Sequence, residues 1–313
     1  MNQRQMFLIL LALGTSWGLT QPLIKIAVSN GHQPFGLIFW QSVIGVITLG
    51  TVRLLQRKPI AMRREHLWFF LLIALTGTVL PHSFSFRATT YLPAGVMAVI
   101  ISLVPIFTFP LALLMRIDRF SWLRLTGLAL GLVGVILLVG PDSLPGNISV
   151  GWVLFALFAP LCYAAESNIV SKWGTYGLGP GHVLFGASVM GILTSLPLAL
   201  ATGQFIDPRI EWGAPEYALI ASSAIHALVY SGHVWLIGRA GAVFATQVAY
   251  VVTATGVVWS MLLLGERYSF WVWGAMGLIA LGMTLVRPGR GNRVAPSQGL
   301  GNNDPKRQRD GQA

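Results

Sequence analysis

Charged side chains are scarce in this sequence. Asp, Glu, Lys and Arg make up only 10% of its 313 residues, whereas hydrophobic residues make up 54%. A soluble protein of ordinary composition carries about 25% charged residues, because its surface must stay hydrated. The shortage therefore argues against a water-soluble domain and indicates that most of this chain lies in an apolar solvent.

Cysteine is almost missing, and so are the common cofactor motifs. The single cysteine, Cys162, cannot form an internal disulfide and falls within an apolar run, where we expect a small packing residue. The sequence has no His-Glu-x-x-His or paired-cysteine spacing and no phosphate-binding glycine loop, so we predict no bound metal and no cofactor. The net charge of +11 is scattered between apolar runs, so we expect no nucleic acid partner.

Long apolar runs are what the sequence has in place of charge. A helix needs about 20 apolar residues to cross the hydrocarbon core of a bilayer. Backbone groups in lipid must be bonded internally, and runs without period-2 alternation exclude a barrel, so each run should be a helix. We predict an all-α integral membrane protein with ten transmembrane helices, at residues 6–27, 35–55, 67–86, 94–115, 122–140, 149–171, 181–201, 216–236, 242–264 and 270–286.

The basic residues predict the orientation of the chain. Lysine and arginine resist translocation, so short loops rich in them stay in the cytoplasm. If the first residues are cytoplasmic, every lysine and arginine falls on that side except Lys25, Arg87, Arg209 and Arg267. We therefore predict that both termini are cytoplasmic and that residues 287–313 form a disordered basic tail. Lys25 and Arg87 lie near the outer ends of their helices, where we expect their side chains to reach the lipid headgroups.

An internal repeat divides the chain. Residues 118–122 read Asp-Arg-Phe-Ser-Trp, and residues 266–270 read Glu-Arg-Tyr-Ser-Phe in the corresponding place. We infer two five-helix repeats, at residues 6–140 and 149–286. Because each repeat has an odd number of helices, the second must enter the membrane inverted. Two inverted halves can exchange conformations and so open a shared cavity to either side of the membrane.

Several short motifs, in a fixed order, resemble a known family. They are Ser16-Trp17-Gly18, Tyr91-Leu92-Pro93-Ala94-Gly95, Leu103-Val104-Pro105 and Leu264-Gly265-Glu266-Arg267. With ten spans in two repeats, the chain resembles EamA-type members of the drug/metabolite transporter superfamily over roughly residues 6–287. The resemblance implies export or import of amino acids, nucleosides, sugars or other metabolites. The sequence departs from the family pattern at Gln41, where many relatives have arginine, and at Thr253, where proline is common.

Polar residues inside the predicted helices are candidates for a solute site, because such groups are costly in lipid. Glu166 lies about 8 Å from the inner end of its span at a rise of 1.5 Å per residue, and is the leading acidic candidate. His226 and Tyr230 share one face of the eighth span, and that face should point into the bundle. The alternative for these groups is a static hydrogen-bonded seam between packed helices.

Neutral and aromatic groups complete the candidate site. The expected substrate-binding residues are Trp17, Gln21, Gln41, His82, Tyr163, Glu166, His226, Tyr230, Gln247 and Tyr250. Individually each could be a packing contact, and their expected convergence at the interface between the repeats is what favours binding. Such groups suit an uncharged or zwitterionic solute.

The function predicted from these observations is secondary transport. We expect a multi-pass inner-membrane carrier that moves a small-molecule substrate by alternating access, as an exporter, with protons as a candidate coupling ion. The chain is expected to act in the lipid bilayer as a monomer or a homodimer, and not as an enzyme. The alternatives are a membrane-embedded enzyme on lipid-like substrates, for which clustered acids or a nucleophile are missing, and a non-transporting membrane scaffold.

Overall fold

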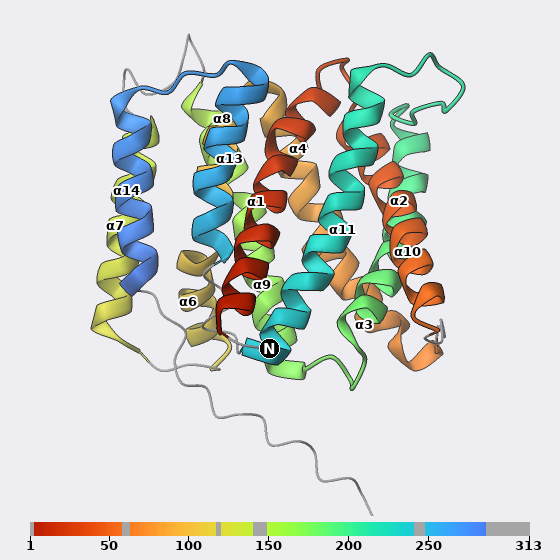
Figure 1. Ribbon diagram of the computed structural model, residues 1–313, viewed down its shortest axis with the longest axis horizontal. Coiled ribbons are helices and arrows are strands. Elements are labelled where there is room, and N and C mark those ends of the chain that lie inside the picture. Colours follow the sequence, from red (N-terminus) through yellow and green to blue (C-terminus); the bar gives the residue numbers. More distant parts are fainter. Residues whose placement is uncertain (1–2, 58–62, 117–119, 140–148, 241–247, 286–313) are drawn as a thin grey trace, which may run out of the picture.

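The computed structural model describes residues 3–57, 63–116, 120–139, 149–240 and 248–285. Within these ranges all regular secondary structure is helical and no strand occurs, so the prediction of an all-α fold is confirmed. The helices stand side by side, and α1 and α11 run from one edge of the molecule to the other, while shorter helices such as α6 and α8 cover part of that height (Figure 1).

The N-terminal half contains the elements up to α7. They are α1 (Gln3–Ala27), α2 (Pro34–Leu55), the 3-10 turn η1 (Arg64–His66), α3 (Leu67–Ala74), the π-helical turn η2 (Leu75–Val79), α4 (Leu80–Tyr91), α5 (Ala94–Ile101), α6 (Val104–Leu114) and α7 (Trp122–Val139). The C-terminal half contains α8 (Val150–Ala156), α9 (Phe158–Trp173), α10 (Pro180–Ala201), α11 (Ala214–Ala240), α13 (Val248–Leu264) and α14 (Phe270–Leu285).

The described helices fall on the predicted membrane spans. Six segments are long and apolar enough to cross a bilayer: Arg4–Ala27, Pro34–Leu55, Arg64–Tyr91, Ala94–Leu114, Val150–Trp173 and Pro180–Ala201. Shorter apolar helices occur at Leu125–Leu137, Val251–Leu264 and Phe270–Gly282. The multi-pass membrane fold is therefore confirmed, while the count of ten helices and the cytoplasmic side of both termini stay predictions.

Proline and glycine set several helix boundaries. Pro34 and Pro180 stand in the first turns of α2 and α10, where a missing backbone N–H costs nothing. Gly174 has a positive φ of 70° directly after α9, a conformation that glycine adopts without strain. The predicted fourth span is broken between α5 and α6, where Pro105 in the first turn of α6 cannot donate the bond that would continue α5.

The two halves pack in a pattern that is preserved when they are exchanged. Three pairs match each element with its counterpart in the other half: α2 with α10, α5 with α13, and α7 with α14. The remaining main contacts occur as mirrored sets, since α1 packs on α11 and α13, while α9 packs on α4 and α6. The contact of α2 with α11 likewise mirrors that of α10 with α3. Each half therefore uses equivalent elements to hold the other.

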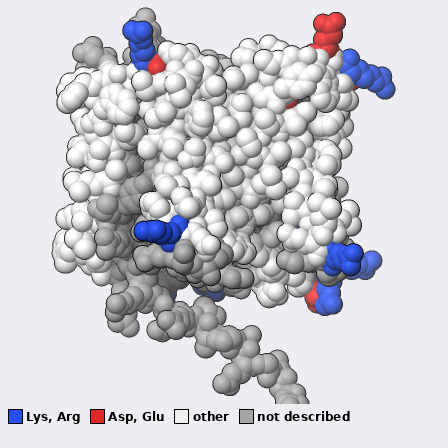
Figure 2. All heavy atoms as spheres, in the orientation of Figure 1, with Lys and Arg blue, Asp and Glu red and all other residues white. Residues whose placement is uncertain are grey.

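The apolar core lies where the halves meet, and charge lies at the ends. Val96 and Ile100 of α5 and Ala275 of α14 are fully buried, and Val257 of α13 is only 1% exposed. Figure 2 shows most of the visible charged side chains near the two edges of this face, with a basic group set further in at the lower left and an uncharged band above it. In Figure 1 α1 begins at the lower edge, and α14 runs down toward that same edge.

Lys25 and Arg87 are held by protein groups near the upper ends of α1 and α4. The Lys25 ammonium donates hydrogen bonds to the carbonyl oxygens of Thr89 at 2.7 Å and Leu92 at 2.9 Å, and so caps the end of α4. Arg87 donates to the side-chain oxygen of Gln33 at 2.8 Å. Both side chains thus bond to protein groups at this edge, and their contact with the lipid headgroups stays a prediction.

Candidate functional site

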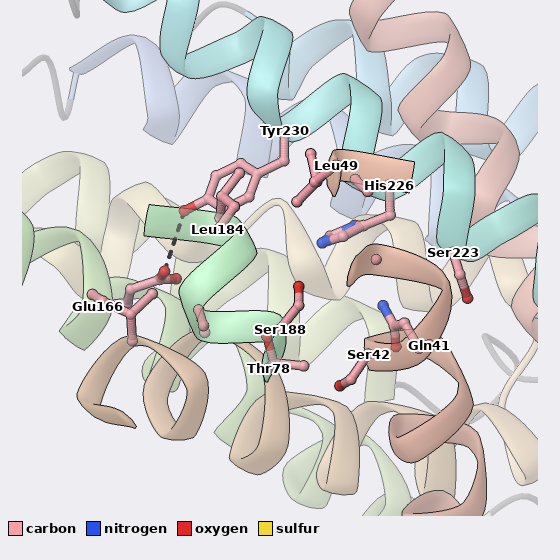
Figure 3. Close-up of a pocket in the computed structure, with 15 residues that line it drawn as sticks. Gln41, Ser42, Leu49, Thr78, Glu166, Leu184, Ser188, Ser223, His226 and Tyr230 are labelled. Atoms are coloured by element: carbon pink, nitrogen blue, oxygen red, sulfur yellow. Dashed lines mark hydrogen bonds between the residues drawn. The ribbon is translucent and has the colours of Figure 1, made fainter. Parts of the chain in front are cut away.

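A polar cavity lies between the two halves. Its walls come from α2, α3 and η2 of the N-terminal half and from α9, α10 and α11 of the C-terminal half. The space open to the centres of water molecules is about 40 Å³, which is room for roughly three waters at about 10–15 Å³ each. Figure 3 shows polar side chains from several of these helices pointing toward this space.

Glu166 supplies the carboxylate of the cavity. It lies on α9, is only 6% exposed, and accepts a hydrogen bond of 3.2 Å at Oε1 from the hydroxyl of Tyr230 on α11. On its other side the carboxylate lies against Gly77, in the π-helical turn η2. A Cβ at Gly77 would come within 2.5 Å of Oε1 and 2.6 Å of Oε2, so only glycine leaves room for this carboxylate. Such π-helical turns are rare and occur frequently at functional sites.

Three buried polar atoms on the opposite wall have no hydrogen-bond partner among the described residues of the protein. They are Oε1 of Gln41 and Oγ of Ser42, both on α2, and Oγ of Ser223 on α11. These residues are 9%, 2% and 3% exposed, and all three line the cavity. A buried polar atom without a partner costs about 1–3 kcal/mol, so native proteins keep few of them. Three such atoms at one cavity leave this wall with hydrogen-bonding capacity toward the cavity.

An aromatic cluster surrounds the cavity. The Trp17 ring on α1 lies 5.8 Å from the His226 ring and 5.9 Å from the Tyr230 ring. The His82 ring on α4 lies 5.8 Å from His226 and 6.2 Å from Tyr163. The rings meet mostly edge to face, an arrangement that orients neighbouring rings. His226 is thus held between Trp17 and His82, with its ring in the cavity wall.

The structure brings most of the predicted site residues together. Gln41, Glu166, His226 and Tyr230 line the cavity. Trp17, His82 and Tyr163 lie behind it and reach it through ring contacts. Gln21 is not part of this wall, since its side chain lies against Gly256 of α13. Gln247 and the side chain of Tyr250 lie outside the described residues.

Sequence reasoning missed four polar residues of the cavity: Ser42, Thr78, Ser188 and Ser223. A signal was present for Ser223, which precedes His226 by three residues and Tyr230 by seven, and so shares their helix face. The role of Gly77 had no such signal. It depends on the approach of α9 to η2, which involves residues far apart in the sequence.

Metal ligands do not gather in the described part of the chain. No group of three or more His, Cys, Asp or Glu side chains there is placed to hold a metal ion. His82 and His226 are neighbours, and the only other close aromatic partners recorded for them are phenylalanine, tyrosine and tryptophan rings.

Hydrogen bonds tie the two halves together above the cavity, at the start of α2. The Trp40 indole donates to the carbonyl oxygen of Ile206 at 2.9 Å, and the backbone N–H of Phe35 donates to Oε1 of Gln204 at 3.0 Å. Gly36 allows this approach, because a side chain there would clash with the carbonyl oxygen of Gln204. The upper end of α2 is thus fixed to the segment that follows α10.

A second tie links Glu266 to the start of α5. Its Oε1 accepts from the backbone N–H of Ala94 at 2.9 Å, and its Oε2 accepts from that of Gly95 at 3.2 Å and from the hydroxyl of Tyr268. Burial raises the pKa of Tyr268, and its bond to the Glu266 carboxylate raises it further, so the hydroxyl keeps the proton that it donates. The carboxylate serves as an N-cap supplied by the other half of the chain.

Comparison with known proteins agrees with this architecture. Residues 4–140 and 150–287 each match the EamA-like transporter family. The uncharacterized inner membrane transporter YedA of Escherichia coli strain K12 is 26% identical over 309 residues, which cover 91% of each chain. A probable terminal-alkyne amino-acid exporter of Streptantibioticus cattleyicolor is 20% identical over 256 residues, covering 80% of this chain and 82% of the exporter.

A solved crystal structure shares the fold. It matches with a TM-score of 0.61 at 18% sequence identity, over 90% of this chain and 97% of that chain. The family resemblance predicted from the motifs is confirmed by the two matched stretches. The predicted multi-pass location in the inner membrane is confirmed by the family and by the relative from Escherichia coli. The family and these relatives are transporters rather than enzymes.

Proposed function

Because the chain belongs to the EamA-like transporter family and is therefore a membrane transporter, we propose that it carries a small metabolite across the inner membrane by alternating access. One observation carries the proposal. The polar cavity is walled by three elements of each half, so a rocking motion of one half against the other would change which side of the membrane the cavity faces.

The exchange symmetry of the packing supports this mechanism. Inverted repeats can adopt each other's conformation, which turns a cavity open to one side into a cavity open to the other. The main contacts of the described helices map onto themselves when the halves are exchanged, as such a mechanism requires. The first and second repeats, at residues 6–140 and 149–286, are the proposed moving units.

Hydrogen bonds between the two halves at the upper edge support a conformation in which the cavity is closed on that side. Trp40 bonded to Ile206 and Glu266 bonded to Ala94 each join one half to the other. His32 and Glu216 add a contact of 2.6 Å between the halves on the same side. By the predicted orientation this edge is the outer one. We assign export as the direction of transport, in keeping with the name of the exporter relative, and protons as the coupling ion.

Accessibility of single cysteines tests the proposal. In a Cys162→Ser background, Arg116→Cys and Arg267→Cys place one thiol at each exposed edge, and Ser188→Cys places one in the cavity wall. A membrane-impermeant maleimide should label Arg116→Cys only from the cytoplasmic side and Arg267→Cys only from the outside. It should label Ser188→Cys from both sides. Leu198→Cys, on the surface of α10, is the unlabelled control.

Two results would contradict the mechanism. Labelling of Arg116→Cys and Arg267→Cys from the same side would rule out the inverted arrangement. Labelling of Ser188→Cys from one side only would rule out a cavity that alternates. Transport itself is then measured in proteoliposomes, with solutes first selected by the rise in melting temperature that ligand binding produces.

A further inference from the structure

The cavity has one charged end and one neutral end. In Figure 3, Glu166 lies at one end of the cavity, and Gln41, Ser42 and Ser223 lie at the other, with His226 and Ser188 between them. The lining contains Glu166 as its acidic residue and includes no lysine or arginine. A solute that fills this space therefore meets a carboxylate at one end and uncharged hydrogen-bonding groups at the other.

The carboxylate end selects for positive charge. Glu166 is 6% exposed, and the hydrogen bond recorded for its side chain comes from the neutral hydroxyl of Tyr230. A buried carboxylate is stabilised by an opposite charge far more than by a neutral donor. A protonated amine offers that charge together with three N–H donors in a small volume. An ammonium group is thus the ligand group that fits this end.

The neutral end selects against a carboxylate. Gln41 Oε1 is an acceptor without a partner, and the hydroxyls of Ser42 and Ser223 can donate or accept. A solute carboxylate placed there would meet neutral donors and no lysine or arginine, so its desolvation would be offset less than at a site with a fixed positive charge. A hydroxyl or an amide can bond to all three groups without that cost.

These two ends together define a substrate class. Resting on the proposed transport function, we propose that the protein carries a small amine whose ammonium group binds Glu166 and whose neutral hydroxyl or amide binds Gln41, Ser42 and Ser223. The lining also includes Leu49, Ile73 and Leu184, which offer apolar surface to a short aliphatic chain. The preferred solute is an amino alcohol or amino amide rather than an amino acid.

Four compounds with one carbon skeleton test the proposal. Leucinol carries the amine and a hydroxyl, leucine carries the amine and a carboxylate, 2-hydroxy-4-methylpentanoate carries a hydroxyl and a carboxylate, and 4-methylpentane-1,2-diol carries two hydroxyls. Binding is measured by thermal shift on the full-length protein, and transport by counterflow in proteoliposomes. Leucinol should bind at least tenfold more tightly than each of the other three. Tighter binding of leucine or of the hydroxy acid would overturn the proposal.

Substitutions at the two ends of the cavity test which residues determine the preference for leucinol. Glu166→Gln keeps the shape of the side chain and should remove the preference for leucinol over the diol. His226→Gln should retain that preference, because the ammonium group is assigned to the carboxylate. Ser223→Ala should weaken the binding of leucinol and of the diol to the same extent. Ser195→Ala, whose hydroxyl bonds to Gly191 within its own helix, should change neither. A preference that survives Glu166→Gln, or that disappears in His226→Gln, would overturn the assignment.

The same experiments separate failure of this inference from failure of the transport function. If the protein moves other metabolites but not leucinol, and Ser188→Cys is labelled from both sides, the substrate class is wrong and the carrier mechanism stands. If Ser188→Cys reacts from one side only and no solute undergoes counterflow, the proposed function itself fails and the inference fails with it.

Discussion

Glu266 accepts a 2.9 Å hydrogen bond from the backbone N–H of Ala94, so a carboxylate from the C-terminal half caps the first turn of α5 in the N-terminal half. A tie of this kind contributes to stability and also holds the upper edge of the halves together. Losing a helix N-cap usually costs about 0.5–2 kcal/mol.

Glu266→Gln should therefore lower stability by about 0.5–2 kcal/mol and loosen the upper edge. We expect a lower melting temperature and faster maleimide labelling of Ser188→Cys from the outside. Glu211→Gln removes an exposed carboxylate that lies in the segment between α10 and α11. It is the matched control and should leave both measurements unchanged. Unchanged outside labelling in Glu266→Gln would show that this cap does not hold the edge closed.

Gly77→Ala tests the fit of the Glu166 carboxylate against η2. The added Cβ would lie 2.5 Å from Oε1, so the carboxylate or the helix must move, and overpacking of this kind costs about 1–3 kcal/mol. The affinity for leucinol, measured by thermal shift, should fall. The loss of binding free energy should exceed the loss in the free energy of unfolding of the protein without solute. Gly277→Ala adds a Cβ that meets no atom within 4 Å among the described neighbours, and should leave binding unchanged. Equal affinities of Gly77→Ala and Gly277→Ala for leucinol would contradict the proposed fit of the Glu166 carboxylate against Gly77.

Tyr230→Phe removes the hydroxyl that donates to Glu166 at 3.2 Å and keeps the ring that contacts Trp17. Hydrogen bonds to charged groups contribute about 1.5–3 kcal/mol, which corresponds to roughly 10- to 100-fold in affinity. We expect leucinol counterflow to slow within that range while the protein stays folded. Tyr217→Phe, at a side chain 60% exposed, is the control. Full activity of Tyr230→Phe would remove this hydroxyl from the site.

Gln41→Leu should separate stability from function. Gln41 Oε1 is buried without a partner, and replacing the amide with an apolar group relieves a cost of about 1–3 kcal/mol. The melting temperature without solute should rise by roughly 1.5 °C for each kcal/mol gained, from an unfolding entropy of about 2.1 cal/mol/K per residue. Leucinol binding should weaken, because the wall loses an acceptor. A variant that is less stable than the parent would show that Gln41 is a structural residue rather than part of the solute site.

The sequence was most informative where the membrane limits what a residue can do. A polar group such as Glu166 or Gln41 in an apolar run must face the interior, so both could be placed in the cavity before the structure was known. Helix positions followed for the same reason, because the bilayer thickness sets the length of each run.

The neighbours of Gln21 and Lys25 could not be predicted from the sequence, and the physical cause is the same for both. A helix periodicity shows which residues share a face, but it does not show which other helix packs on that face. Trp17 and Gln21 share a face of α1, yet α1 packs on both α11 and α13. Trp17 therefore contacts the cavity residues, while Gln21 meets Gly256 of α13. The bonding partners of Lys25 could not be predicted for a similar reason, because the carbonyls at the end of α4 come from a distant part of the chain.

The π-helical turn at Leu75–Val79 determines which side of α4, the next helix of the same span, faces each neighbouring helix. A turn of this kind holds one residue more than an α-helical turn, and each residue of an α-helix rotates the chain by about 100°. Deleting one residue here would turn α4 relative to α3 through about that angle. His82 would leave the His226 ring and Arg87 would leave Gln33. In evolutionary terms, one inserted codon suffices to give α3 and α4 different partners.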